Sequence, residues 1–218
     1  MEIEKGTLTE LVLERLRDDI VAGAYDAGQN LRIEMLKERY GTGASPLREA
    51  LARLATEGFV VSETNRGFRV SPMSRDDLED IALVRKTVES EALSLAIRNA
   101  GDEWEVGIVA ALQRLKLAAN RRYDNADERM AALESAHWQF HRAIIEGCGS
   151  PRLSELQATF YRQGVRYRRL AFDELFDVKK FVTEHESLAE ELASRDIARA
   201  TKALRAHIGI TSEEIFPS

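Results

Sequence analysis

Helical periodicity dominates this 218-residue chain after Pro72, and strand-like runs occur only before it. Over residues 74–213 apolar side chains recur at steps of three and four, the spacing of amphipathic helices. Two short β-branched and aromatic runs, at 59–62 and 68–71, flank an Asn-Arg-Gly turn and predict a β-hairpin. We therefore expect a mainly α chain with two units, residues 1–72 and residues 73–218.

The first unit carries three helical segments before its hairpin. Apolar spacing predicts helices over 8–22 and 33–40, and a third that begins near Ser45-Pro46 and ends at Gly58. The order helix, short helix, helix, hairpin within about 65 residues is typical of a winged helix-turn-helix. After Pro72 only helices are expected, arranged as an antiparallel bundle.

A winged helix-turn-helix suggests which side chains reach DNA. The second helix of the motif enters the major groove, and residues near its start contact base edges. Arg48 lies in the first turn of the predicted helix, where a guanidinium can pair with guanine or with a phosphate. Ser45 can hold a phosphate at the helix start. Arg66 and Arg69 lie on or beside the hairpin, where a wing touches the DNA backbone.

The charge balance supports this interpretation only weakly. The whole chain has 31 Lys and Arg against 37 Asp and Glu, a net charge of −6. Residues 28–72 have a small basic excess, seven against five, so long-range attraction to DNA should be weak. From the residues alone, these arginines either contact DNA or are ordinary solvent-exposed residues on the surface of a small domain.

The four histidines of the chain all lie in the second unit. His137 and His141 are four residues apart and share one helix face. His185 and His207 lie ten residues before and twelve after Arg195, at the turn between two helices. At 1.5 Å per residue they stand about 15 and 18 Å from that turn, nearly level in an antiparallel pair. Three inward-facing helices can thus bring four imidazoles to one point.

Such a cluster has more than one explanation. Neutral imidazoles suit a divalent metal, zinc first and also nickel or copper. Alternatively, each histidine is a structural residue with a local hydrogen bond. A metal with an open position can activate water, so a metal-dependent hydrolase is the alternative function. The sequence has no HExxH motif, nucleophile elbow or glycine-rich phosphate loop. A third alternative is a DNA-binding scaffold that ignores small molecules.

The first unit resembles the DNA-binding domain of the GntR family of bacterial transcription regulators. The matching strings are LRIEMLKERYG at 31–41, SPLREALARL at 45–54, EGFV at 57–60 and NRG at 65–67. The family usually has a serine and then an arginine before the proline of the second string, and this chain has Gly43 and Ala44. One expected DNA-contacting arginine is therefore missing, which leaves the operator sequence open.

Residues 74–213 resemble the all-helical FCD ligand-binding domain of the FadR branch of that family. The matching strings are FHRAI at 140–144, GSPRL at 149–153, EHESL at 184–188 and ALRAHI at 203–208. In metal-binding members, one helix gives an aspartate and then a histidine, and two later helices give one histidine each. The resemblance puts His141, His185 and His207 on the histidine positions and His137 on that of the aspartate.

The resemblance also implies an effector. An arginine near the position of Arg85 faces the effector cavity in this branch, where it can grip a carboxylate. Arg166 is a second candidate. The alternatives are a surface pair of Arg85 with Glu89, and a solvated basic face around Arg166. The strings at 101–105 and 146–150, with Arg166-Tyr-Arg168, most resemble the carbon-starvation-induced repressors, which are associated with small dicarboxylates such as glutarate.

Composition suggests where such a protein works. The single cysteine, Cys148, excludes an internal disulfide and favours a reducing compartment. No apolar run reaches the roughly 18 residues of a membrane span, and the acidic start MEIEK lacks the features of a secretory signal. We expect a cytoplasmic, ligand-responsive repressor with no membrane partner. It should bind a pseudo-palindromic double-stranded operator as a homodimer joined through its helical unit.

Overall fold

The computed structural model describes residues 8–63, 67–99, 101–175 and 177–216. The chain divides into two compact units between Ser74 and Arg75. Among the described residues, the only sheet is one two-stranded hairpin, and helices make up most of both units. The expectation of a mainly α chain, with a winged helix-turn-helix followed by an all-helical bundle, is confirmed.

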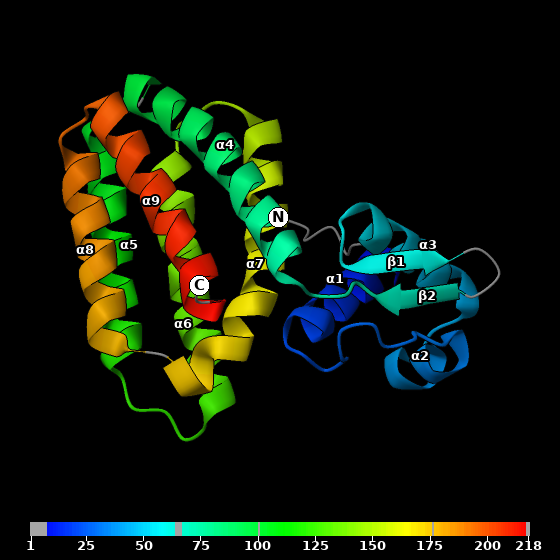
Figure 1. The fold of residues 1–218 in the computed structure, drawn as a ribbon. Coiled ribbons are helices and arrows are strands. Elements are labelled where there is room, and N and C mark those ends of the chain that lie inside the picture. Colours follow the sequence, from blue (N-terminus) through cyan, green and yellow to red (C-terminus); the bar gives the residue numbers. More distant parts are fainter. Residues whose placement is uncertain (1–7, 64–66, 100, 176, 217–218) are drawn as a thin grey trace, which may run out of the picture. The chain divides into compact units, whose positions relative to one another are not determined.

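The first unit has the predicted order of elements: α1 (Leu8–Val21), α2 (Ile33–Tyr40), α3 (Ala44–Thr56), β1 (Val60–Glu63) and β2 (Gly67–Val70) (Figure 1). The strands pair antiparallel, with Val60 opposite Val70. Helix α2 ends at Gly41, whose φ of 62° is left-handed and whose N–H donates to the carbonyl of Lys37. Glycine takes this conformation without a steric penalty, so the chain turns sharply and α3 starts three residues later.

An apolar core holds the first unit together. The helices and the hairpin meet over side chains that are fully buried: Leu16, Leu36, Leu47, Leu51, Leu54 and Phe59. Three of them recur along α3 at the four- and three-residue steps of one helix face. Among the residues described in this unit, no buried side chain is charged.

The second unit consists of α4 (Arg75–Asn99), α5 (Asp102–Asn120), α6 (Ala126–Ile145), α7 (Pro151–Leu175), α8 (Val178–Ala193) and α9 (Ile197–Ile215). Polar caps start several of them. Asn125 accepts a hydrogen bond of 2.8 Å from the backbone N–H of Glu128, and Ser150 accepts one of 3.3 Å from that of Leu153. Side chains at these positions satisfy N–H groups that a helix start leaves free.

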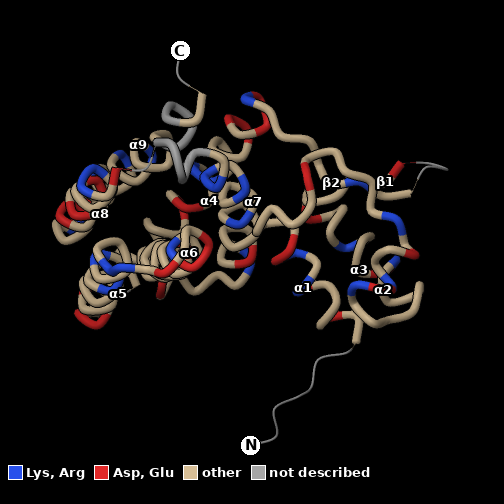
Figure 2. The backbone as a smooth tube through the Cα atoms, turned by 90° about the horizontal axis from the view of Figure 1, so that it is seen from below, with Lys and Arg blue, Asp and Glu red and all other residues tan. Residues whose placement is uncertain are grey.

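Helix α6 is the centre of the second unit. It contacts α4, α5 and α7, while α8 packs on α5 and α9, and α9 packs on α4. Figure 2 looks along this bundle and places α6 between α5 and α7. Side chains that point inward from α6 are therefore surrounded by other helices. Among the described helices, none combines the length and the apolarity needed to cross a lipid bilayer.

Candidate functional site

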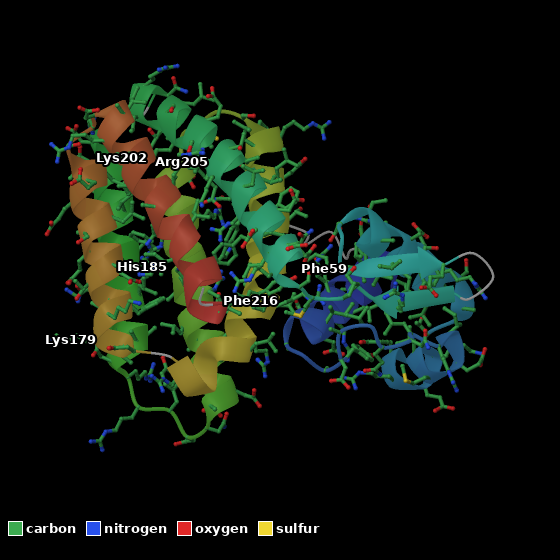
Figure 3. The ribbon with its side chains drawn as sticks, viewed as in Figure 1. Phe59, Lys179, His185, Lys202, Arg205 and Phe216 are labelled. Atoms are coloured by element: carbon green, nitrogen blue, oxygen red, sulfur yellow. The ribbon has the colours of Figure 1, made fainter. Side chains whose placement is uncertain are left out.

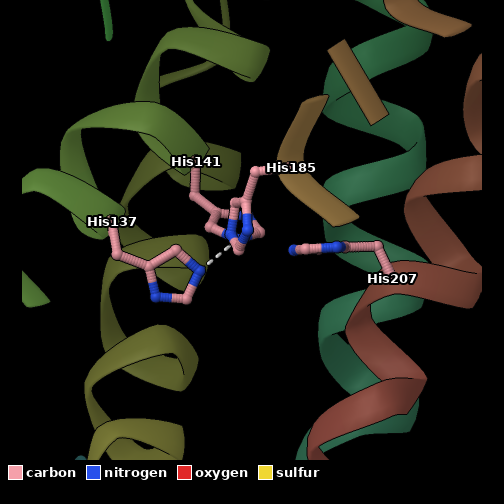
Figure 4. A group of neighbouring side chains, drawn as sticks. All are labelled: His137, His141, His185 and His207. Atoms are coloured by element: carbon pink, nitrogen blue, oxygen red, sulfur yellow. Dashed lines mark hydrogen bonds between the residues drawn. The ribbon is translucent and has the colours of Figure 1, made fainter. Parts of the chain in front are cut away.

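Four imidazoles converge inside the second unit (Figure 4). His137 and His141 come from successive turns of α6, His185 from α8 and His207 from α9. If one ring nitrogen is taken from each histidine, the four nitrogens all lie within 4.8 Å of one another. His185 lies midway along α8 and is buried, whereas Lys179 in the first turn of that helix is exposed (Figure 3). The structure thus brings together all four histidines of the chain.

Hydrogen bonds occupy only some of the ring nitrogens. The Nε2 atoms of His137 and His141 lie 3.0 Å apart. His185 Nδ1 lies 2.7 Å from the carbonyl oxygen of Phe181. That oxygen can only accept, so Nδ1 carries the proton and Nε2 of a neutral ring has a free lone pair. Among the described residues, His185 Nε2 and His207 Nδ1 are buried without a hydrogen-bond partner. Such atoms are unusual and need an explanation.

Burial keeps these imidazoles neutral. It lowers the pKa of His185 to about 3 and holds the pKa values of His137 and His207 well below 6.5. Burial also lowers the pKa of His141, although the neighbouring carboxylate of Glu89 opposes this shift. Neutral imidazole is the form that ligates a metal, because its lone pair is available.

The donor set fits a transition metal. Nitrogens about 2.0–2.1 Å from a tetrahedral zinc lie roughly 3.4 Å from one another, and one nitrogen of each histidine lies within 4.8 Å of those of the others. Four nitrogens suit zinc, nickel or copper better than the oxygen-preferring ions. Behind the rings, Glu134 Oε2 lies 3.8 Å from His137 Nδ1, and Glu89 Oε2 lies 3.5 Å from His141 Nδ1. Carboxylates in such positions orient metal-binding imidazoles.

Arg85 and Glu89 form a buried pair on α4. Arg85 Nε lies 2.7 Å from Glu89 Oε1, and the two side chains are 6% and 0% exposed. The alternative of a surface pair is therefore wrong, because this face of α4 points into the bundle. Although burial raises the pKa of Glu89, the charge of Arg85 lowers it to about 2, so the carboxylate is ionised. Arg85 Nη2 is buried and has no hydrogen-bond partner.

A further arginine beside Glu134, Arg168 on α7, was not predicted, and its side chain is 13% exposed. Its Nε and Nη2 atoms each donate to one oxygen of Glu134 at 2.7 Å, and the hydroxyl of Tyr161 donates to the same carboxylate at 3.1 Å. The guanidinium carbons of Arg85 and Arg168 lie 5.2 and 4.8 Å from the centre of the Tyr161 ring. Glu134 precedes His137 by three residues on the same helix face, and that spacing is the sequence signal that could have pointed to Glu134 as a partner of the histidine cluster.

Arg166, the second predicted effector ligand, has a different acidic neighbour. It is 7% exposed, so the alternative of a solvated basic face is wrong. Burial lowers its pKa, and the charge of Asp77 opposes that shift. Asp77 also accepts a hydrogen bond from the hydroxyl of Tyr167. Asp77 lies eight residues before Arg85 on α4, about 12 Å along the axis. Arg168 instead pairs with Glu134, which lies 3.8 Å from His137, so Arg168 is the α7 arginine linked to the histidine cluster.

The predicted DNA-contacting residues of α3 are both exposed. Ser45 and Arg48 lie close to the start of the helix. The helix begins at Ala44, with Gly43 as its N-cap and no side-chain hydrogen bond at that cap. Ser45 is therefore the second residue of the helix and not its cap. The first N–H groups of α3 are left for another acceptor.

The wing residues differ from each other. Arg69 on β2 pairs with Glu63 on β1, with 2.6 Å between Arg69 Nε and Glu63 Oε1. Its charge is partly neutralised by this pairing, which reduces its attraction for a phosphate. Arg66 lies outside the described residues.

Two family models match the chain, one for each unit. The model described as bacterial regulatory proteins of the gntR family matches residues 8–70. The FCD domain model matches residues 80–209. Together they cover the winged helix-turn-helix and nearly all of the helical bundle.

Similar proteins are regulators as well. An uncharacterized HTH-type transcriptional regulator, BphR, of Paraburkholderia xenovorans (strain LB400) is 37% identical over 93% of this chain and 82% of its own length. The HTH-type transcriptional repressor GlaR of Escherichia coli (strain K12) is 34% identical over 88% of this chain and 89% of its own length.

The fold is shared with a solved structure of E. coli McbR/YncC. It has a TM-score of 0.73 at 23% identity and covers 94% of this chain and 95% of that chain. Because these relatives are transcriptional regulators and not enzymes, the metal-dependent hydrolase alternative is not favoured. The chain belongs to the GntR family of bacterial transcriptional regulators, with a GntR DNA-binding domain followed by an FCD domain.

Proposed function

We propose that this regulator is a repressor whose operator binding is controlled by a small carboxylate, bound at or near a divalent metal that the histidine cluster holds. The convergence of four neutral imidazoles, three of them buried and the fourth, His207, half-buried, carries this proposal. A purely structural role would leave His185 Nε2 and His207 Nδ1 buried with no partner, which costs about 1–3 kcal/mol for each such atom. A bound metal would satisfy them.

The metal would be held by His141, His185 and His207, with His137 beside them. Zinc suits this set best, and nickel or another transition metal is the alternative. When bound, such an ion supplies positive charge to which a carboxylate oxygen can bind. Without that charge a carboxylate would be costly to bury in a helical bundle.

Arg85 supports the carboxylate part of the proposal. Its Nη2 atom is buried and lacks an acceptor, and a guanidinium binds a carboxylate through two parallel N–H groups. The resemblance to the carbon-starvation-induced repressors suggests a dicarboxylate such as glutarate. Arg166 is the less favoured effector ligand, because its charge interacts with Asp77.

The DNA contacts would come from the first unit. Arg48 on α3 would reach a base edge or a phosphate, and Ser45 with the free N–H groups of the helix start would bind a phosphate. Arg66 and Arg69 would touch the backbone from the wing. A single unit of this size makes a small interface, so two copies on a pseudo-palindromic operator would give useful affinity.

A homodimer would bring the two copies together through the helical unit. That unit exposes large apolar side chains on several helices, which a two-fold contact could cover: Leu83, Val106, Val109, Leu117, Leu156 and Leu170. The effector would control DNA binding by favouring one arrangement of the dimer, and only by as much as it binds that arrangement more tightly.

Calorimetric titration of glutarate tests the proposal. The samples are metal-loaded protein, chelated protein and the His185→Ala variant, each after metal analysis. Affinity should fall at least about tenfold in the last two samples, and operator binding without effector should change far less. Lys179→Ala, an exposed change on the same helix, is the matched control and should behave as wild type. Equal affinities in all samples would show that the histidines are structural.

A further inference from the structure

We infer that Arg85 and Arg168 together bind the second carboxylate of the effector, so that the regulator selects dianions over monoanions. Arg168 is the residue that determines this specificity. The inference rests on the proposed function, because it needs a first carboxylate at the histidine cluster. It adds a binding residue and a charge requirement.

Both guanidinium groups keep N–H groups that their own carboxylates do not use. Glu134 occupies Nε and Nη2 of Arg168 and leaves Nη1. Glu89 occupies Nε of Arg85, whose Nη2 is buried and without a partner. A buried guanidinium has five donors in a fixed plane and is costly to leave half satisfied. Unused donors on two neighbouring arginines are suited to an incoming anion.

The two arginines approach the same point of α7. A Cβ placed on Gly164 would lie 3.4 Å from Arg168 Nη1 and 3.7 Å from Arg85 Nη1. Both nitrogens thus gather over a residue without a side chain, close enough for one carboxylate to accept from both with bonds of about 2.9 Å. A glycine inside a helix costs about 1 kcal/mol relative to alanine. Outside the neighbouring backbone, no third heavy atom lies within 4 Å of that Cβ position, and we infer that this is the place that a carboxylate takes.

The order of the charged groups separates the two places where a carboxylate would bind. Glu89 lies between His141 and Arg85, and Glu134 lies between His137 and Arg168. The arginines are therefore one carboxylate further from the imidazoles on both sides. A short chain with a carboxylate at each end would place one end at the histidine cluster and the other at the two guanidinium groups.

The balance of buried charge favours a dianion. Each arginine is neutralised by its own glutamate, and the four imidazoles are neutral. A divalent metal would therefore bring two uncompensated positive charges into the interior. A dianion cancels both, whereas a monoanion leaves one buried charge, which is unfavourable.

Glutarate and pentanoate, which have five carbon atoms each, test the inference by calorimetry on full-length, metal-loaded protein. Wild type should bind glutarate at least about tenfold more tightly than pentanoate. Arg168→Lys keeps a positive charge beside Glu134 but loses the paired N–H groups of the guanidinium. It should therefore lose most of that preference, while its affinity for pentanoate stays within about threefold of wild type. Arg169→Lys is the matched control, because Arg169 is also an α7 arginine paired with an acid of α6.

Gly164→Ala is a second variant that keeps every charged group. Its methyl group would make ordinary contacts with both arginines, so the protein should fold with an equal or higher melting temperature. The methyl group would occupy the space of the carboxylate, so glutarate affinity should fall more than pentanoate affinity.

The outcomes separate this inference from the proposed function. If Arg168→Lys and Gly164→Ala keep the wild-type preference, or wild type has none, the two-arginine receptor is wrong, while metal-dependent binding of either acid still supports the proposed function. If metal-loaded wild type binds neither acid, both are wrong.

Discussion

The two units of this regulator bury different kinds of side chain. Among the described residues, the first unit buries apolar and tyrosine side chains, and its charged groups remain at the surface. The second unit buries two arginines, a glutamate, a glutamine and three histidines: Arg85, Glu89, His137, His141, Gln157, Arg166 and His185. Both units are built from amphipathic helices, so helix formation does not explain this difference.

The proposed function would explain this difference. A DNA-binding unit needs its charges outside, where phosphates can reach them. A unit that encloses a small anion needs charged and ligating groups inside, each supported by a partner. Gln157 illustrates such support, because its Nε2 donates to the carbonyl of His141 at 2.9 Å and ties α7 to α6. The burial of polar groups in the second unit is therefore what the proposed small-molecule site would require.

The largest expected effect comes from breaking the buried charge pair of α4. Glu89→Gln keeps the size of the side chain but leaves Arg85 without a counter-charge. The free energy of unfolding of the metal-free second unit should fall by about 3–5 kcal/mol. Both tryptophans lie in that unit, so urea unfolding followed by tryptophan fluorescence reports on it.

Glu79→Gln is the matched control on the same helix. Glu79 pairs with Arg75 at 3.9 Å on the surface, and its side chain is 57% exposed. Its substitution should change the unfolding free energy by less than about 0.5 kcal/mol. Equal effects of the two substitutions would contradict the difference between buried and exposed charge.

Acid should destabilise the second unit and spare the first, which contains no histidine. In metal-free protein the pKa of His185 is lowered to about 3 by burial, whereas unfolded histidine titrates near 6.5. Between these values the unfolded chain binds a proton that the folded chain excludes. The contribution of the neutral imidazole to the free energy of unfolding is therefore fully present above pH 6.5. It falls by about 1.4 kcal/mol per pH unit for each such imidazole as the pH drops toward 3.

Urea unfolding at several pH values, again by tryptophan fluorescence, measures this slope. His185→Leu should reduce it by the contribution of one imidazole. A slope that is unchanged in the variant would mean that His185 gains its proton in the folded protein.

The exposed charge of α3 should matter for DNA alone. Arg48→Ala should cost about 1–3 kcal/mol of specific operator affinity if Arg48 contacts a base. The stability of both units should be unchanged. Gel-shift titration at fixed salt measures the loss, with Arg53→Ala, another exposed arginine in the last turn of the same helix, as control. Wild-type affinity of the Arg48 variant would remove Arg48 from the interface.

The smallest effect is expected at the uncapped start of α3. Gly43 has φ −75°, and nothing lies within 4 Å of a Cβ placed there. Gly43→Ser should add a cap and stabilise the first unit by a few tenths of a kcal/mol. Gly43→Asp should stabilise it similarly but weaken operator binding, because its charge repels the phosphate. Thermal melts and gel shifts of both variants check this, and unweakened DNA binding by Gly43→Asp would mean that no phosphate lies at this helix start.

Much of the fold was predictable from short-range signals. Apolar spacing predicted the helices of the first unit close to their observed bounds. The convergence of His185 and His207 followed from helix rise and an antiparallel turn, which are geometric constants. What was predictable depended on neighbours along the chain.

The partners of the histidines were not predictable, because they depend on how each helix is rotated about its own axis. Arg166, Arg168 and Arg169 stand close together on α7, and the charge pattern gives no reason to prefer one of them. Arg168 is the one that pairs with Glu134 and stacks over Tyr161, whose ring packs beside His137 and His141. Likewise, Arg85 and Glu89 have the spacing of a common surface pair, and only the contacts of α4 with its neighbours bury them.

The burial of these groups also has a consequence for time. Glu89, His141 and Arg85 are 0%, 1% and 5% exposed, so even a water molecule barely touches them. The proposed carboxylate could reach them only when the helices around α6 separate, so we expect its association rate to be limited by that opening and not by collision. The same opening limits its escape. If the proposed effector binds there, the regulator would respond to effector levels that persist longer than the opening time and would not follow shorter fluctuations.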